Sequence, residues 1–183
     1  MYFVQKRTRG WSAIASMCLL SLSVACLPAL AADAGSPSPI RIAVFDFEVE
    51  DVSPAASQPG RTPADSARLQ AVTNAARRVL AQSGHYSIVD VSKADAAPVR
   101  QKSLRDCDGC EAGIGLQLGA EQALVGVVRR VSMTDYYVMI QISDCRTGKV
   151  LTQQAANFAG GEEGWASGVA TMIRHQVLVD DKP

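Results

Sequence analysis

The segment Ile40–Glu48 alternates between two faces, and both faces are apolar. This pattern predicts a β-strand that is covered on both sides, not one that faces water. Pro39 precedes the segment and the acidic run Glu48–Asp51 follows it, so we expect the strand to be bounded there. One face carries Ile40, Ile42 and Val44, and the other carries Ala43, Phe45 and Phe47.

The next segments predict two helices separated by a strand. Thr62 can cap a helix that has Pro63 at its first position and ends at Gly84. Residues Tyr86–Val91 then predict a second strand, and residues 111–118 a short helix. The apolar face of the long helix consists of Leu69, Val72, Ala76, Val79 and Leu80.

The carboxyl-terminal half predicts three strands and a last helix. The strands cover residues 123–131, 136–143 and 150–158, with a hairpin turn at Arg146–Lys149. We therefore predict an α/β (α+β) fold with a single mixed sheet of about five strands in the order β-α-β-α-β-β-β-α, spanning residues 40–180 as one domain. The inner face of the last helix is Trp165, Val169, Met172, Ile173, Gln176 and Val177.

Residues 1–31 have the pattern of a signal peptide. A basic start precedes the apolar run 13–27, and small residues at Ala29 and Ala31 predict cleavage after Ala31. Alternatives are a retained membrane anchor, or a lipoprotein attached to the outer membrane through Cys26, which follows a degenerate lipobox. After cleavage no stable membrane span is expected. Residues 32–39 predict a flexible linker, and the compartment is expected to be the periplasm.

Charge and aromatic content narrow the classes of function. The full chain has no net charge, but residues 1–31 hold three basic residues and no acidic one, so the remainder has 15 basic and 18 acidic residues. A weakly acidic protein lacks the basic face that nonspecific nucleic-acid binding requires. Aromatic residues make up only 5% of the chain, which disfavours stacking platforms for bases. We therefore expect no nucleic-acid partner.

Asp46, Arg130 and Asp135 are the candidate binding residues. Asp46 interrupts the apolar pattern near the carboxyl end of the first strand, where ligands bind in open α/β sheets. It either serves a small-molecule site or has a structural role, in which it caps the next loop or pairs with a nearby base, and the structural role is favoured. Arg130 and Asp135 form either a polar recognition patch or a solvated hairpin tip, and we favour the tip. Arg77 is expected on a solvated helix face.

Three cysteines follow the predicted cleavage site: Cys107, Cys110 and Cys145. In an oxidising compartment we expect Cys107 and Cys110 to form a structural disulfide. The alternative is a thiol–disulfide oxidoreductase, in which a cysteine at a helix start has a lowered pKa. Nearby acids oppose that alternative because negative charge raises a thiol pKa. These acids are Asp106, Asp108 and Glu111.

No metal or cofactor is predicted. Haem attachment requires a histidine where Glu111 stands, and a zinc site requires four ligands, whereas His85 and His175 lie far from the cysteine pair in sequence. Cys145 is either a buried free thiol or a cysteine that exchanges with the pair or with a partner. No catalytic residue is predicted, because no second catalytic group can be named to act with Asp46.

Four motifs in a fixed order resemble a known family. They are residues 40–47, 84–90, 118–126 and 143–150. The pattern resembles a family of uncharacterised secreted proteobacterial proteins, a domain of unknown function. More distantly it is similar to the TolB amino-terminal domain and to the lipoproteins of curli secretion and of penicillin-binding-protein activation. The resemblance implies a non-catalytic envelope protein that binds another protein, and it supplies no catalytic residues.

Overall fold

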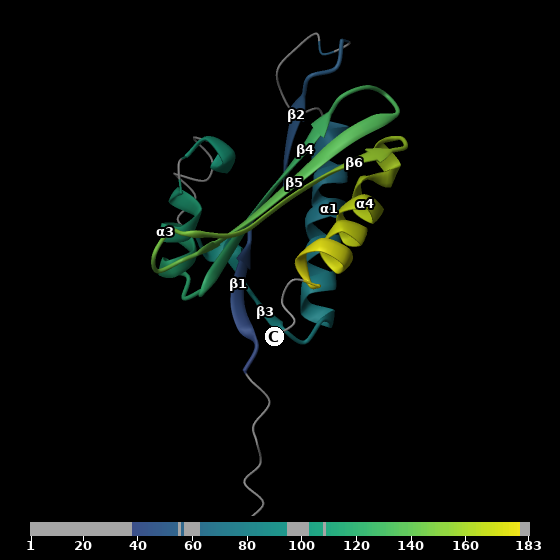
Figure 1. Cartoon of the computed structure of the whole chain (residues 1–183). Coiled ribbons are helices and arrows are strands. Elements are labelled where there is room, and N and C mark those ends of the chain that lie inside the picture. Colours follow the sequence, from purple (N-terminus) through teal and green to yellow (C-terminus); the bar gives the residue numbers. More distant parts are fainter. Residues whose placement is uncertain (1–37, 55, 57–62, 95–102, 108, 180–183) are drawn as a thin grey trace, which may run out of the picture. The chain divides into compact units, whose positions relative to one another are not determined.

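The computed structural model describes residues 38–54, 56, 63–94, 103–107 and 109–179. Its strands form one six-stranded mixed sheet, and helices α1, α3 and α4 pack against it (Figure 1). The predicted α/β fold class is therefore confirmed. The strands are β1 (Ile40–Val44), β2 (Glu48–Asp51), β3 (Tyr86–Val89), β4 (Gln122–Arg130), β5 (Asp135–Asp144) and β6 (Val150–Ala159). The helices are α1 (Pro63–Gln82), α3 (Cys110–Gln117) and α4 (Trp165–Met172), with short turns η1 (Val91–Lys93), η2 (Leu104–Asp106), η3 (Glu162–Gly164) and η4 (Ile173–Val177).

The sheet combines a parallel part and an antiparallel part. Its order is β3-β1-β4-β5-β6, and β1 runs parallel to both neighbours. Strands β4, β5 and β6 are antiparallel, and β6 lies at the edge, as its polar sequence predicts. The predicted second strand is shorter than expected, because Val91 belongs to η1.

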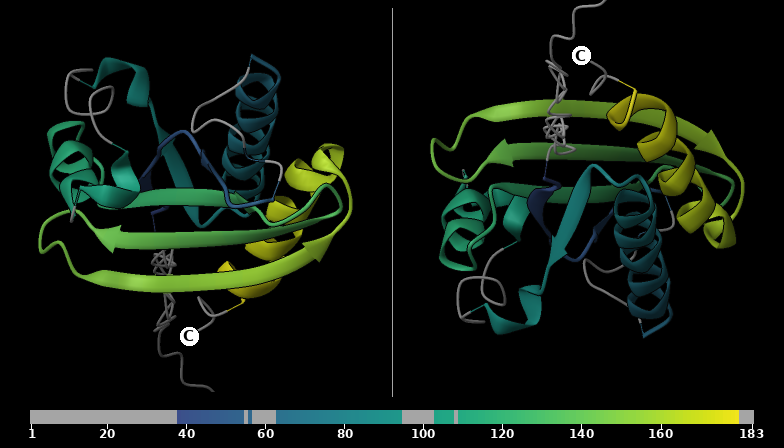
Figure 2. Two further views of the ribbon diagram at one scale, coloured as in Figure 1. Left: turned by 90° about the horizontal axis from the view of Figure 1, so that it is seen from above. Right: turned by 90° about the horizontal axis from the view of Figure 1, so that it is seen from below.

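The two faces of the sheet are covered by different elements. Helices α1 and α4 lie side by side on one face, whereas α3 lies on the opposite face (Figures 1 and 2). Residues of β1 are buried on both sides: Ile42 and Val44 lie in the core under α1 and α4, and Ala43 and Phe45 lie in the core near α3. The predicted two-sided coverage of the first strand is thus confirmed.

The prediction of one continuous strand over Ile40–Glu48 is wrong. The strand breaks after Val44 and resumes at Glu48, and both parts pair with β4. Val44 is opposite Leu124 but Glu48 is opposite Val127, so the first strand has one residue more than β4 across the break. Such an extra residue changes which face the following side chains occupy. As a result Phe47 joins the core of α1 and α4, and not the side of Ala43 and Phe45 as predicted.

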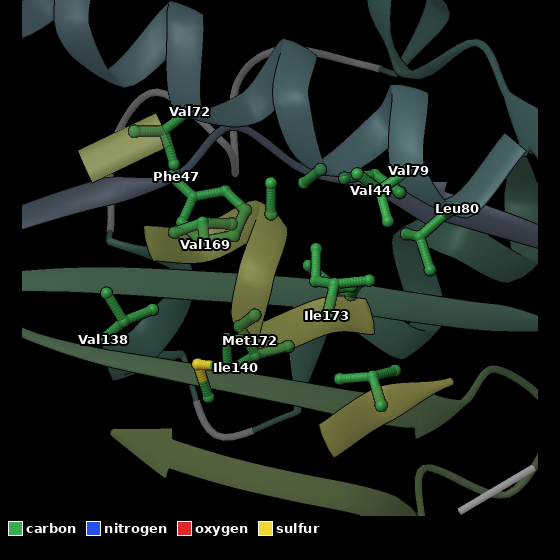
Figure 3. Packing of buried hydrophobic residues seen from close by; sticks show 14 of the residues in the cluster. Val44, Phe47, Val72, Val79, Leu80, Val138, Ile140, Val169, Met172 and Ile173 are labelled. Atoms are coloured by element: carbon green, nitrogen blue, oxygen red, sulfur yellow. The ribbon is translucent and has the colours of Figure 1, made fainter. Parts of the chain in front are cut away.

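Phe47 is fixed in this position from both sides. Its backbone N–H donates to Thr73 Oγ1 (3.0 Å), and that buried hydroxyl donates to the carbonyl of Leu69 (2.9 Å) within α1. Its ring lies over Gly126 of β4, in the space that a Cβ atom there would occupy. Figure 3 shows Phe47 packed close to Val169 of α4. Gly126 in β4 therefore leaves space for the ring of Phe47, which the break in the first strand places on this face of the sheet.

The acidic run after the break forms strand β2 (Glu48–Asp51), although its sequence predicts only the boundary of the first strand. Glu50 pairs with Arg129 and Asp51 with Arg130 in the parallel register. Opposite charges on neighbouring strands stabilise such pairing. The salt bridges measure 2.7 Å from Arg129 Nε to Glu50 and 2.6 Å from Arg130 Nη1 to Asp51.

Several predictions lie outside the described residues. These are the signal peptide with its cleavage site at Ala31, the lipid anchor at Cys26, and the linker up to residue 37. In the part of the chain that the structure describes, no helix is both long and apolar enough to cross a membrane.

Candidate functional site

Asp46 lies at the break in the first strand and pairs with a base. Its side chain is 76% exposed, and Arg77 Nη2 lies 3.1 Å from its Oδ1. The same guanidinium donates from Nε and Nη2 to the carbonyl of Val44 at 3.2 and 2.7 Å. The sequence predicts Arg77 on a solvated helix face, but in the structure its guanidinium also has a structural contact. It binds the carbonyl of the last residue of β1 and stabilises the irregular backbone there.

A recess of about 560 Å³ lies beside Asp46, at the carboxyl ends of β1 and β3. Phe45, Ile88 and Leu104 contribute apolar walls, and Asp46 and Asp90 contribute carboxylates. This is the place predicted for a small-molecule site, and that hypothesis stays a prediction.

Two carboxylates organise the loops around this recess. Asp90 accepts hydrogen bonds from the hydroxyl and the backbone N–H of Ser92 (2.7 and 3.0 Å), which lower its pKa. Glu48 accepts from the Ser103 hydroxyl and from the N–H of Leu104 (2.7 Å), and so joins η2 to the start of β2. The walls of the recess are therefore positioned by hydrogen bonds within the loop at Asp90 and by bonds from Glu48 to residues distant in the sequence.

Arg130 is the centre of a charged network at the other end of β4. Its guanidinium contacts Asp51, Asp65 and Glu162, each at 2.6 Å, and its carbon lies 5.2 Å from the centroid of the Trp165 ring. The Arg130 side chain is only 14% exposed and that of Asp65 only 4%. The predicted solvated tip is therefore wrong for Arg130, because the residue links strand β2, helix α1 and turn η3.

This network shifts the titration of its members. Partial burial acts to raise the pKa of Asp51, but hydrogen bonds from Ser53 and Arg130 outweigh it and hold that pKa below its ordinary value. Burial acts to lower the pKa of Arg130, but its bonds to Asp51 and Asp65 raise it overall. Arg130 therefore stays protonated, and Asp51 stays ionised, over the physiological pH range.

Asp135 organises the turn between β4 and β5. Its carboxylate accepts from the hydroxyls of Ser132 (2.8 Å) and Thr134 (3.0 Å). Its backbone carbonyl accepts from the N–H groups of Val131 and Ser132, at 3.0 Å in both cases. The structure does not bring Asp135 together with Asp46, which lies at the break in the first strand. These contacts of Asp135 are within its own turn and do not include Arg130.

Three exposed apolar side chains lie together at this hairpin tip. Val52 is 51% exposed, Val131 43% and Met133 84%. The N–H of Val52 donates to the carbonyl of Arg130 (3.0 Å), which places Val52 beside Val131, and Met133 is in the turn that follows. We call these three residues the apolar tip.

An acidic recess of about 660 Å³ adjoins the apolar tip. Met133 belongs to both features. Glu163, at the recess, is exposed, and Glu162 is bound to both Arg68 and Arg130 at 2.6 Å. The residues that line this acidic recess are Asp51, Ser53, Pro54, Arg130, Ser132, Met133, Gly161, Glu162 and Glu163.

The cysteine pair lies at the start of α3. Cys107 and Cys110 form a disulfide with a Cα–Cα distance of 5.5 Å. Beside it, Glu111 is only 2% exposed, and its carboxylate accepts from Ser143 Oγ at 3.0 Å. Cys145 is a buried free thiol. Burial raises its pKa to about 11, with the charges of Asp144 and Glu111 adding to the effect.

The burial of Glu111 and the partners of Arg130 are not predicted from the sequence. The sequence contains no signal for the buried Glu111, because its partner Ser143 lies 32 residues away on another element. The partners of Arg130 also lie far from it in the sequence, with Asp51 79 and Asp65 65 residues away. The opposite charges of Glu50–Asp51 and Arg129–Arg130 are nevertheless a signal for the pairing of β2 with β4.

The fold and these surfaces define the class of protein as a small mixed α/β domain. The family model DUF3280, described as a protein of unknown function (DUF2380), matches residues 40–177, and the chain belongs to this family. The predicted resemblance to a domain of unknown function is thereby confirmed. No curated protein sequence matches the chain.

Solved structures with a similar fold share little sequence with it. The C-terminal domain of LpoB from Escherichia coli is 18% identical, with a TM-score of 0.48, over 68% of this chain and 86% of that one. Lipoprotein GNA1162 from Neisseria meningitidis is 18% identical, with a TM-score of 0.47, over 78% and 96%. TolB from Acinetobacter baumannii is 12% identical, with a TM-score of 0.43, over 76% of this chain and 28% of that one.

Proposed function

We propose that this protein is an exported, periplasmic accessory protein of the cell envelope that acts by binding another protein, and that the apolar tip and the acidic recess are its binding surface. The observation that carries the proposal is the exposure of Val52, Val131 and Met133 at one end of β2 and β4, where Met133 also lines the acidic recess. Contiguous exposed apolar side chains with a polar rim are typical of interaction sites.

Charge complementarity defines the partner. Among the described residues around the tip and the recess, carboxylates outnumber guanidiniums six to three. A partner segment with basic side chains around an apolar one therefore fits both parts of the surface. An anionic membrane surface does not, because like charges repel. The charged residues are Glu50, Asp51, Asp65, Asp135, Glu162 and Glu163 against Arg68, Arg129 and Arg130.

The position of the surface also supports this role. The described part of the domain begins at Ser38, next to β1, and β1 pairs with the first residues of β4. The apolar tip follows the last residue of β4, at the far end of the same strand. A domain held to the envelope through its amino terminus would thus present the tip away from its attachment.

Binding of a short synthetic peptide in which lysine and leucine alternate tests this surface. The mature chain is expected to bind it, and Met133→Ser and Glu163→Lys are each expected to weaken binding by about tenfold, equivalent to about 1.4 kcal/mol. Titration calorimetry measures the affinity. Binding should weaken at high salt, because exposed charges are screened within about 10 Å at 0.1 M salt.

Two controls accompany this experiment. A peptide of the same length in which glutamate replaces lysine should not bind. Leu116→Ser changes a side chain that is 51% exposed on α3, away from the tip, and should leave the affinity unchanged. Equal binding of both peptides, or equal losses in Met133→Ser and Leu116→Ser, would contradict the proposed surface.

Export has its own test. When the full chain is expressed in a Gram-negative bacterium, the mature protein is expected in the periplasm with Ala32 as its first residue, as amino-terminal sequencing and intact mass would show. A mass increase on a chain that begins at Cys26 would instead identify the lipoprotein alternative. A cytoplasmic chain that retains residues 1–31 would contradict export.

A further inference from the structure

Glu111 is a buried carboxylate without a counter-charge. It is 2% exposed, and its hydrogen-bond partners on the sheet are neutral: Ser143 Oγ at 3.0 Å and Gln141 Nε2 at 3.4 Å. Among the described residues, no basic side chain lies within ion-pair distance of it. Burial of an ionised carboxylate is costly unless a cation compensates its charge. The position therefore favours a positive charge that the described residues do not supply.

The free oxygen of this carboxylate is directed toward the cysteine pair. Ser143 and Gln141 both bond to Oε1, whereas Oε2 lies 4.0 Å from Cys107 Sγ. An oxidised sulfur cannot donate a hydrogen bond, so this contact is not one in the disulfide form. The two sulfurs and one carboxylate oxygen of Glu111 all lie within 4.8 Å of one another. In metal sites, hydrogen bonds from neighbouring residues commonly orient a carboxylate that binds the metal. Glu111 has this arrangement, because Oε1 is hydrogen-bonded and Oε2 faces the sulfurs.

We propose that Cys107, Cys110 and Glu111 form a site for a thiophilic divalent cation of the zinc class when the disulfide is reduced. Zinc bonds of about 2.3 Å to sulfur and 2.0 Å to oxygen at tetrahedral angles place the sulfurs about 3.8 Å apart and sulfur and oxygen about 3.5 Å apart. In the structure Oε2 lies 4.0 Å from Cys107 Sγ, and both sulfurs and the carboxylate oxygen lie within 4.8 Å of one another. The two sulfurs, which are bonded in the disulfide, would have to move apart after reduction to reach the zinc geometry. Three protein ligands leave the fourth position to water.

The reaction that opens the site is an ordinary thiol–disulfide exchange. A dithiol reductant transfers two electrons and two protons to the pair: its own S–S bond forms while the Cys107–Cys110 bond breaks and two thiols form. Cation binding then releases both thiol protons to solvent. The cation compensates the charges of two thiolates and of Glu111, which without it repel one another.

Cadmium and zinc are the probes for this site. The full mature chain is reduced with a dithiol, freed of reductant without oxygen, and titrated with Cd²⁺. One equivalent per chain is expected to produce the ultraviolet charge-transfer band of cadmium–thiolate bonds, and the oxidised chain should give none. Zn²⁺ should displace Cd²⁺ and protect Cys107 and Cys110 from alkylation by iodoacetamide.

Variants separate the ligands from their surroundings. Glu111→Gln should weaken Zn²⁺ binding by about tenfold or more, and Cys145→Ser should leave stoichiometry and affinity unchanged. Absence of the band in the reduced wild-type chain would overturn the proposal even if Glu111→Gln fails to fold, and so would unchanged affinity in a folded Glu111→Gln variant. Insulin reduction by a chain that binds neither cation would identify a thiol–disulfide oxidoreductase instead.

Discussion

Replacement of Gly126 by alanine is expected to destabilise the fold by about 2–3 kcal/mol, because the new Cβ would overlap the ring of Phe47. The ring cannot yield easily. Phe47 is completely buried, and its backbone is bound to Thr73 of α1. The loss of stability is partly offset, because a glycine within a strand is about 0.5–1 kcal/mol less stable than an alanine. Urea denaturation measures the difference in the free energy of unfolding.

A matched glycine and a second-site change test the explanation. Gly113 on α3 is exposed, and a Cβ there meets nothing within 4 Å, so Gly113→Ala should stabilise the protein by about 0.5–1 kcal/mol. The pair Gly126→Ala and Phe47→Leu should couple, with the smaller side chain relieving the overlap. If the two changes are simply additive, the contact with Phe47 is not the cause.

Replacement of Arg130 by methionine is expected to cost about 3 kcal/mol at neutral pH. The change removes the cation that three carboxylates share, although Arg68 still contacts Asp65 and Glu162. The side chain of Asp65 is only 4% exposed. Removal of one member of a buried charged group is strongly destabilising because the remaining charges lose their compensation. Arg130→Lys should retain only part of the stability, since an ammonium group cannot contact three carboxylates in the geometry of a guanidinium.

The neighbouring arginine is the control. Arg129 is 46% exposed and pairs with Glu50 on the surface, so Arg129→Met should change stability by less than about 1 kcal/mol. Equal effects of the two substitutions would show that the Arg130 network contributes no more than a surface ion pair.

The effect of Arg130→Met should also depend on pH. The pKa of Asp51 is lowered in the folded protein, so its ionised form stabilises the fold above its unfolded value of about 3.9. That contribution disappears as the pH falls through the lowered folded value. The stability difference between wild type and Arg130→Met should therefore narrow below about pH 4, and denaturation at neutral and acid pH measures it.

Local patterns account for most of the elements that the sequence predicts. The apolar face of α1, the alternation of β5 and the turn before β6 depend on neighbouring residues, and each is present in the structure. The first strand illustrates the limit. Its alternation is regular through Phe47, but the break depends on a register with β4 and on space over Gly126. Neither is visible from residues 40–48.

In the candidate sites, too, contacts between residues close in sequence are predictable and contacts between distant residues are not. The C-x-x-C spacing, together with an expected oxidising compartment, predicts a disulfide between Cys107 and Cys110, because the two cysteines are close in sequence. The interpretation of Arg130 as a solvated tip followed from its place beside a hairpin turn. Its burial depends on Asp51, Asp65 and Glu162, which approach from three separate segments. The charge of a residue can be predicted from sequence, but the number of partners that converge on it cannot.

The pairing of β1 also determines the order in which the domain can be completed. Ile42 is opposite Ile88 on one side and Gln122 on the other, so the second neighbour is synthesised about 80 residues after β1 itself. Parallel pairing over such separations forms slowly compared with hairpins. Strands β4, β5 and β6 can assemble from adjacent segments as soon as they exist. Strand β1 is synthesised first but is paired on both sides only after more than half of the domain has been synthesised. Its apolar side chains therefore become buried late.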